Sequence, residues 1–286
     1  MEIGKNFADL VSYNENMTKG MEDKLWFFKH LDADHTYIFV DFGCADGTLI
    51  NILTQLEETK NSSFIGYDIS ETMIDLAKTK FSWEPDADVN FFTKWDDVVK
   101  EMNYKKSHLF NPSKIKKVLI LSSVIHEVFS YGNHESIKEF FDNIKNSGFD
   151  YIFVRDMMAS KDANRASANS KVASIRSIAK ENCVTYATME KYVRDFEKHH
   201  GSIENNLNLM HFLLKYRWKI NWEREVNENY FPIFIEDFLS EMNQKYNVNY
   251  LERFRVPYLD ECIFKDFKIR ISDYTHVKMF FELKKF

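Results

Sequence analysis

The chain has 286 residues, a formal net charge of −6 at pH 7, and a composition that is 44% hydrophobic and 16% aromatic. This length can bury the core of one large domain, and such a composition excludes an intrinsically disordered chain. The acidic balance argues against a dedicated binder of polyanions, because such proteins usually carry a basic surplus that neutralises phosphates.

The cysteines and the N-terminal residues bear on the compartment. Cys44, Cys183 and Cys262 lie far apart and form no C-x-x-C pair, so neither a disulfide framework nor a thiolate zinc site is indicated. The residues MEIGKNFADL hold no basic segment followed by an apolar core, and no uncharged apolar run reaches membrane length. We therefore expect a soluble cytoplasmic protein without a membrane partner.

Residues 1–36 are expected to form an N-terminal helical segment that covers a ligand site. Apolar residues at helical spacing run through KGMEDKLWFFKHL. Core packing explains this stripe as well as a lid does; on the lid interpretation, Tyr13 and Met21 lie over the ligand. The stripe consists of Met21, Leu25, Phe28 and Leu31.

Strand-like runs alternate with amphipathic helical runs over residues 37–156, which is typical of a parallel α/β sheet. Five strands joined by crossover helices predict a doubly wound, Rossmann-like core. Ser70 is placed to cap the helix that follows the second strand. The expected strands are Tyr37–Val40, Phe64–Tyr67, Val89–Thr93, Lys117–Leu121 and Tyr151–Val154.

The alternation ends after Asp156. Residues 157–247 read mostly as helices, which predicts a helical cap inserted after the fifth strand. Residues 248–286 return to strand character in Val248–Val256 and His276–Lys284. With no long helix expected between these two strands, they form an antiparallel pair that completes the sheet.

Asp41, Gly43 and Gly47 form D-x-G-x-x-x-G directly after the first strand. Glycine allows backbone angles and a close ligand approach that a Cβ would block, and the next helix offers unpaired amides. The second strand ends in Asp68, placed to accept hydrogen bonds from ribose hydroxyls. These features predict a nucleoside ligand across the strand tips.

The acidic character of the turn distinguishes between nucleoside ligands. The nicotinamide and flavin fingerprint G-x-G-x-x-G supplies three glycines for a pyrophosphate, whereas this turn has two glycines at another spacing. Asp41 and Asp46 would repel a pyrophosphate but suit a ligand that carries an ammonium and a sulfonium. The turn therefore favours S-adenosylmethionine as the cofactor.

Residues 37–156 resemble the class I S-adenosylmethionine-dependent methyltransferases. The resemblance lies in VDFGCADG, in GYDIS with Met73 and Ile74, and more loosely in FFTKWDD and LILSSVIHEV. It implies an α/β fold with a seven-stranded sheet in the order 3-2-1-4-5-7-6, helices on both faces, and the seventh strand antiparallel.

The resemblance also implies roles for single residues. Asp96 or Asp97 would meet the adenine amino group, although both acids are equally well explained as solvated helix caps. Cys44 is more simply a small buried residue. The implied cofactor-binding residues are Asp41, Gly43, Cys44 and Gly47 at the methionine portion, Asp68 at the ribose, Ile69 and Met73 near the adenine, and Ser122 and Ser123 near the methyl group.

His126 follows the fourth strand and is the candidate general base, with Glu127 as an alternative at the same place. An imidazole with a reference pKa near 6.5 can accept a proton around neutral pH, although local packing explains His126 equally well. HEVFS lacks the second histidine of H-E-x-x-H, and no metal site is indicated.

The methyl acceptor is expected to be a small molecule, with RNA or a nucleotide as the alternative. The place of the D/N/S-P-P-Y/F/W motif reads SSVIHE, which argues against an adenine-N6 or cytosine-N4 DNA methyltransferase. No Pro-Cys dipeptide exists, which argues against a cytosine-C5 DNA methyltransferase. Aromatics interleave with cations in HFLLKYRWKINWERE, which could stack on bases, although burial of the aromatics explains this more simply. A third alternative is a non-catalytic regulatory protein that binds S-adenosylmethionine. The candidate acceptor residues are Arg155, Asp156, Tyr216, Arg217 and Trp222.

Overall fold

A single seven-stranded sheet organises the protein, whose computed structural model describes residues 21–82, 87–108, 111–181 and 187–285. The strand order is β3-β2-β1-β4-β5-β7-β6, and β7 runs antiparallel to both β5 and β6. The predicted fold class is confirmed by this order. The strands are β1 (Thr36–Phe42), β2 (Ser63–Tyr67), β3 (Val89–Phe92), β4 (Ile115–Ser122), β5 (Tyr151–Met157), β6 (Tyr246–Phe254) and β7 (His276–Leu283).

Helices cover both faces of the sheet because alternate residues of each strand point to opposite faces. Ile38 and Val40 of β1 lie in one core with α5, α7 and α12, whereas Tyr37 and Phe39 lie in the other with η1, α3 and α4. The helices on the first face are α5 (Trp95–His108), α7 (His134–Asn146) and α12 (Ile235–Met242), and those on the second are η1 (Trp26–His30), α3 (Thr48–Thr54) and α4 (Glu71–Phe81).

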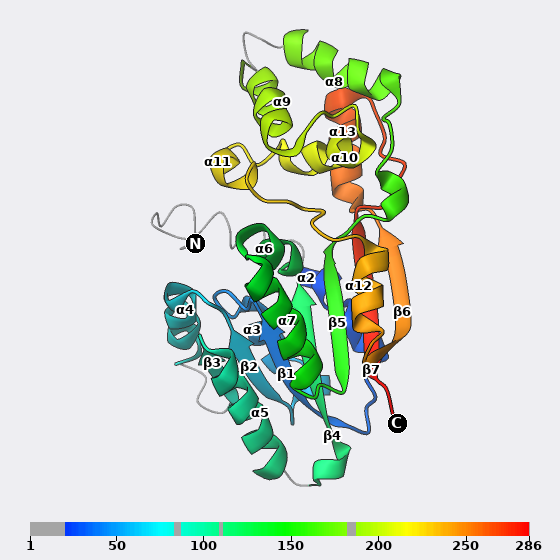
Figure 1. Cartoon of the computed structure of the whole chain (residues 1–286). Coiled ribbons are helices and arrows are strands. Elements are labelled where there is room, and N and C mark those ends of the chain that lie inside the picture. Colours follow the sequence, from blue (N-terminus) through cyan, green and yellow to red (C-terminus); the bar gives the residue numbers. More distant parts are fainter. Residues whose placement is uncertain (1–20, 83–86, 109–110, 182–186, 286) are drawn as a thin grey trace.

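A helical cap stands beyond the carboxyl end of β5 (Figure 1). It has a hydrophobic core of its own, in which Phe196, Phe212 and Phe267 are fully buried. Its helices are α8 (Asn169–Glu181), α9 (Ala187–His200), α10 (Asn206–Lys215), α11 (Trp222–Glu225) and α13 (Pro257–Phe267).

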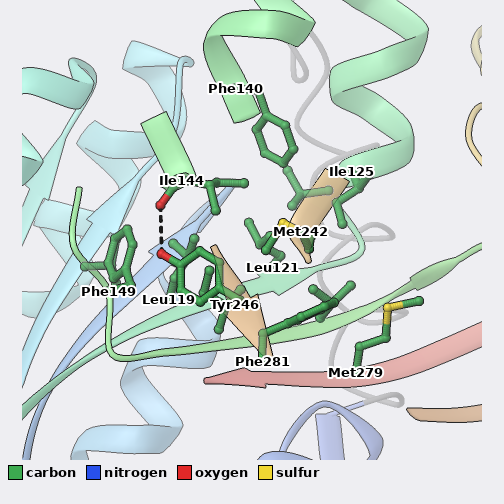
Figure 2. Packing of buried hydrophobic residues seen from close by; sticks show 14 of the residues in the cluster. Leu119, Leu121, Ile125, Phe140, Ile144, Phe149, Met242, Tyr246, Met279 and Phe281 are labelled. Carbon is green, nitrogen blue, oxygen red and sulfur yellow. Dashed lines mark hydrogen bonds between the residues drawn. The ribbon is translucent and has the colours of Figure 1, made fainter. Parts of the chain in front are cut away.

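Two parts of the chain differ from the expected division into cap and sheet. Helix α12 was placed in the cap, yet Phe238 and Met242 pack in the core of the sheet. Figure 2 shows Met242 beside Tyr246, whose hydroxyl donates a hydrogen bond of 3.1 Å to the carbonyl of Ile144. The cap that follows β5 therefore ends before residue 235, and its expected limit at residue 247 is wrong.

Helix α13 is the second difference, since no long helix was expected between the last two strands. Strand β6 ends at Phe254, and Pro257 occupies the first turn of α13, where its missing N–H is not needed. Ile263 and Phe267 then carry this helix into the core of the cap. The cap is thus assembled from two separate segments of the chain.

Short helices complete the described residues, and none of the helices in these ranges could cross a membrane. Helix α6 follows β4 at the edge of the sheet that faces the cap (Figure 1). The remaining elements are α2 (Met21–Lys24), η2 (Glu57–Thr59), η3 (Pro112–Lys114), α6 (Ile125–Tyr131) and η4 (Lys161–Ala163).

The side chains of Phe91 and Cys44 fill the space beside Gly66 of β2, so a larger residue at this position is expected to destabilise the fold. A Cβ at this position would lie 2.4 Å from Cδ1 of Phe91 and 2.8 Å from Sγ of Cys44. We expect Gly66→Ala to lower the free energy of unfolding by about 1–3 kcal/mol through overpacking, measured by urea denaturation. In a Phe91→Leu background, Gly66→Ala should lower the free energy of unfolding by less than it does in the wild type. An equal loss in the two backgrounds would contradict the steric cause.

Candidate functional site

The turn after β1 is held in a conformation that favours glycine. Gly43 and Gly47 have φ of 77° and 74°, and Ala45 between them has φ of 47°. The N–H groups of Gly43 and Cys44 both donate to the carbonyl of Tyr67, at 2.7 and 3.0 Å. A Cβ on Gly43 would lie 2.5 Å from Cγ2 of Val124. The turn is therefore fastened to the end of β2 and approaches the start of α6 closely.

The carboxylate of Asp68 is fixed beside this turn. Its Oδ2 accepts a hydrogen bond of 3.0 Å from the N–H of Ala45, and its Oδ1 accepts one of 2.9 Å from the N–H of Ser70. Ser70 caps α4 as predicted, since its Oγ accepts from the N–H of Met73 at 3.3 Å. Each oxygen of Asp68 can still accept a second hydrogen bond. The adjoining Ile69 has 72% of its surface exposed, which leaves an apolar side chain beside this acid.

Buried charges lie at the same edge of the sheet. Asp41 is 4% exposed, and burial raises the pKa of its carboxyl to about 7 although Lys24 of α2 opposes the shift. Burial lowers the pKa of Lys24 to about 8. Asp46 is engaged elsewhere, because it accepts hydrogen bonds from Lys80 Nζ at 2.8 Å and Thr48 Oγ1 at 2.7 Å. Asp68 also raises the pKa of Asp41, so the two carboxylates and Lys24 form one electrostatic group at this edge.

The end of β4 offers one polar group without a partner. The Oγ of Ser122 is buried and makes no hydrogen bond to the residues described here. Ser123 takes a left-handed conformation with φ of 58°, and its Oγ accepts from Nη1 of Arg155 at 3.1 Å. Arg155 also donates from Nε to Asp23 of α2 at 2.7 Å. Arg155 therefore holds α2 against the strand tips.

His126 and Asp156 form a buried pair at the start of α6. Nδ1 of His126 lies 2.6 Å from Oδ1 of Asp156, whose Oδ2 accepts from the N–H groups of Val124 and Ile125 at 2.9 and 2.6 Å. Burial disfavours the imidazolium, yet the attraction of the Asp156 carboxylate outweighs it and raises the pKa of His126. Burial likewise disfavours the carboxylate, but His126 and main-chain N–H groups lower the pKa of Asp156.

Glu127 lies next to this pair and faces the cap. Burial raises the pKa of its carboxyl to about 6, while His126 opposes the shift. Nη2 of Arg224, from α11 of the cap, lies 3.5 Å from Oε1 of Glu127 and 2.9 Å from Oε1 of Glu228. Nothing in the local sequence indicates that Arg224 or Glu228 meets α6, because they lie about 100 residues further along the chain.

Three candidate acceptor residues do not join His126. Tyr216 and Trp222 are 2% and 3% exposed in the core of the cap; the hydroxyl of Tyr216 donates to Asp266 at 2.8 Å, and Nε1 of Trp222 donates to Asp195 at 3.3 Å. Arg217 lies beside Tyr258, at 3.3 Å from its hydroxyl. Tyr216 and Trp222 therefore offer no stacking surface, as the simpler explanation predicts, whereas Trp218 of the same segment keeps 39% of its surface exposed.

Other candidates occupy the positions that local sequence suggested. Asp96 and Asp97 lie in the first turn of α5, where Asp96 is exposed and Asp97 accepts from Lys100 at 3.1 Å. Cys44 is buried, and burial raises the pKa of its thiol well above the usual value, as for a packing residue. Met73 is buried in α4. Tyr13 lies outside the described residues, and no group of His, Cys, Asp and Glu suited to a metal ion occurs within them.

Comparisons with known proteins add little beyond the fold. No family model and no curated protein matches the sequence. A solved S-adenosylmethionine-dependent methyltransferase from Mesorhizobium loti is similar at 14% identity, over 92% of this chain and 100% of that chain, with a TM-score of 0.48. Magnesium protoporphyrin IX methyltransferase from Synechocystis PCC 6803 with bound SAH is similar at 11% identity, over 99% and 90%, with a TM-score of 0.45. Identities and scores this low carry no functional argument, and the fold assignment depends on the strand order.

The His126–Asp156 pair predicts a pH-dependent stability. The pKa of His126 is raised from 6.5 and that of Asp156 is lowered from 3.8. The pair therefore contributes its full stabilisation to the free energy of unfolding between pH 3.8 and pH 6.5. As pH rises above 6.5 through the folded-state pKa of His126, this contribution is lost. We expect the difference in unfolding free energy between wild type and His126→Gln to shrink from pH 6 to pH 9 in urea denaturation. Asp156→Asn should show the same decline; a difference that grows with pH would contradict the pairing.

Proposed function

We propose that the protein is an S-adenosylmethionine-dependent methyltransferase that methylates a nucleophilic atom of a small molecule. The observation that carries this proposal is the Asp68 carboxylate, fixed by two main-chain N–H groups beside the left-handed turn of Gly43. That pairing stands at neighbouring tips of β1 and β2, in a sheet of the order that the methyltransferase resemblance implies.

Three observations support a fit to the cofactor. Asp68 retains acceptor capacity for two ribose hydroxyls, and the exposed Ile69 offers an apolar surface for adenine. Gly43 packs against Val124 with no room for a Cβ, which fixes the path of the turn beside Asp68. Asp41, although costly to ionise where it is buried, would gain a cation as its neighbour. When bound, S-adenosylmethionine would supply an electrophilic methyl group on a sulfonium.

His126 is proposed to accept the proton that the acceptor loses. Nδ1 of His126 lies against Asp156, which orients the ring and leaves Nε2 as the atom that can take a proton. Among the described residues, none forms a hydrogen bond with Nε2. Because the pKa of His126 is raised, its neutral imidazole prevails only at a pH above 6.5, the usual pKa of histidine. Turnover should therefore increase with pH on the alkaline side.

A small-molecule acceptor is favoured over RNA or a nucleotide by the burial of the cap aromatics. Of the four aromatics in the segment HFLLKYRWKINWERE, Phe212, Tyr216 and Trp222 are packed inside the cap, and Trp218 alone is exposed, at 39%. A non-catalytic protein that binds the cofactor is the other alternative. Product release from labelled cofactor distinguishes it from an enzyme.

Asp68→Ala is expected to weaken binding of S-adenosylmethionine and S-adenosylhomocysteine by roughly 10- to 100-fold. Loss of hydrogen bonds to a charged acceptor costs about 1.5–3 kcal/mol, and every 1.4 kcal/mol is tenfold in affinity. Isothermal titration calorimetry measures the change. Asp75→Ala, an exposed acid on α4, is the matched control and should bind like wild type. Unchanged affinity in Asp68→Ala would remove the ribose assignment.

His126→Ala is expected to lower methyl transfer by at least about 100-fold, as is typical when a general base is lost. The assay incubates the protein with methyl-labelled S-adenosylmethionine and panels of small phenols, amines, carboxylic acids and thiols. Affinity for S-adenosylhomocysteine should remain within a few-fold of wild type, because His126 is not placed in the cofactor contacts. A variant with full turnover on the best acceptor would return His126 to a structural role.

A further inference from the structure

One face of α6 is held by a segment of the cap, residues 224–230, which we call the clasp. Oγ of Ser130 accepts from the N–H of Asn229 at 2.8 Å, and the hydroxyl of Tyr131 donates to Glu228 Oε1 at 2.8 Å. Arg224 reaches Glu127 on the same face. His126 completes this face, with its ring edge against the ring of Tyr230 at a centroid distance of 5.5 Å. The four contacts cover residues 126, 127, 130 and 131, which share one side of the helix.

The clasp is also fixed to the core of the cap. Nζ of the fully buried Lys215 donates to the carbonyl of Glu225 and lies 3.7 Å from the centroid of the Tyr230 ring. The hydroxyl of Tyr230 donates to the carboxylate of Glu225, and its N–H donates to Nε2 of His211 at 3.1 Å. Because the clasp is bonded both to α6 and to the core of the cap, the position of the cap fixes the position of α6.

Arg224 and Glu228 form the charged centre of this arrangement. The Glu228 side chain is almost fully buried, and a buried carboxylate requires partners, which Arg224 and Tyr131 supply. Arg224 lies between Glu228 of the cap and Glu127 of the core, so it neutralises both acids at once. Removing the charge of Arg224 leaves the carboxylates of Glu228 and Glu127 unbalanced next to α6, the helix that carries His126. Removing the charge of Glu228 leaves Arg224 with one fewer carboxylate partner there.

We propose that Arg224 and Glu228 are positioning residues that hold His126 and Glu127 in the geometry for transfer, so that the docked cap completes the acceptor site. This inference extends the function proposed above and depends on it for its catalytic meaning. The charged and titratable groups around His126 are Asp156 on β5, Glu127 on α6, Glu228 and His211 from the cap, and His276 on β7.

Nuclear magnetic resonance of the full chain with labelled histidine imidazoles tests the proposal, with the His126 signal assigned by its loss in His126→Gln. Glu228→Gln removes a nearby negative charge and should lower the His126 titration midpoint by up to about 1 unit. Arg224→Met leaves two carboxylates less neutralised and should raise that midpoint. Arg224→Lys should restore it towards wild type. Arg176→Met is the matched control, because it breaks a 2.8 Å ion pair with Glu197 inside the cap and should leave the His126 signal unchanged.

The signs of the two shifts decide the outcome. Opposite shifts in Glu228→Gln and Arg224→Met support the proposal, whereas unmoved His126 signals in the folded variants would overturn it. Glu228→Gln keeps the side-chain shape and can still accept from Tyr131, so a folded variant is expected even if Arg224→Met does not fold. Calorimetry with S-adenosylhomocysteine runs in parallel. Absence of binding by wild type would remove the proposed function, while the imidazole signals would still decide whether the clasp positions His126.

Discussion

The buried carboxylate of Asp156 is the group on which the arrangement of the candidate site depends. It accepts hydrogen bonds from the N–H groups of Val124, Ile125 and Met157 and also pairs with His126. An ionised carboxylate in this setting would be costly without such partners. Because the donors come from α6 as well as from β5, satisfying this one charge fixes the start of α6 against the strand tips.

The other features of the site follow from that placement. Once α6 begins at the strand tips, Val124 packs against Gly43, and the turn after β1 can tolerate no side chain there. The same helix then presents His126 and Glu127 towards the cap, where Arg224 meets them. Buried charges in such a network need partners, and the contacts on both sides of the clasp supply them to Glu228, Arg224 and Lys215.

The sequence predicted most of the sheet, the turn after β1 and the cap of α4 because these depend on short-range patterns. Strand alternation, the spacing of Gly43 and Gly47, and the cap at Ser70 are local signals, and the strand order came with the family resemblance. Asp156 was expected near the acceptor, but its pairing with His126 joins residues 30 positions apart and has no local signal. The burial of Tyr216 and Trp222 was the simpler interpretation of the aromatic run, but the run does not reveal that Trp218 is the aromatic left exposed. Pro257 was interpreted only as a stop, although the same residue is well suited to begin a helix.

The return of α13 to the cap has a consequence for how the chain acquires its structure during synthesis. Ile263 and Phe267 complete the core of the cap, and Met279 and Phe281 of β7 complete that of the sheet. Both cores therefore lack essential parts until α13 and β7 have left the ribosome. Nascent chains that lack these two elements expose unfinished apolar surfaces on both the cap and the sheet, so the cap does not complete its packing well before the sheet does.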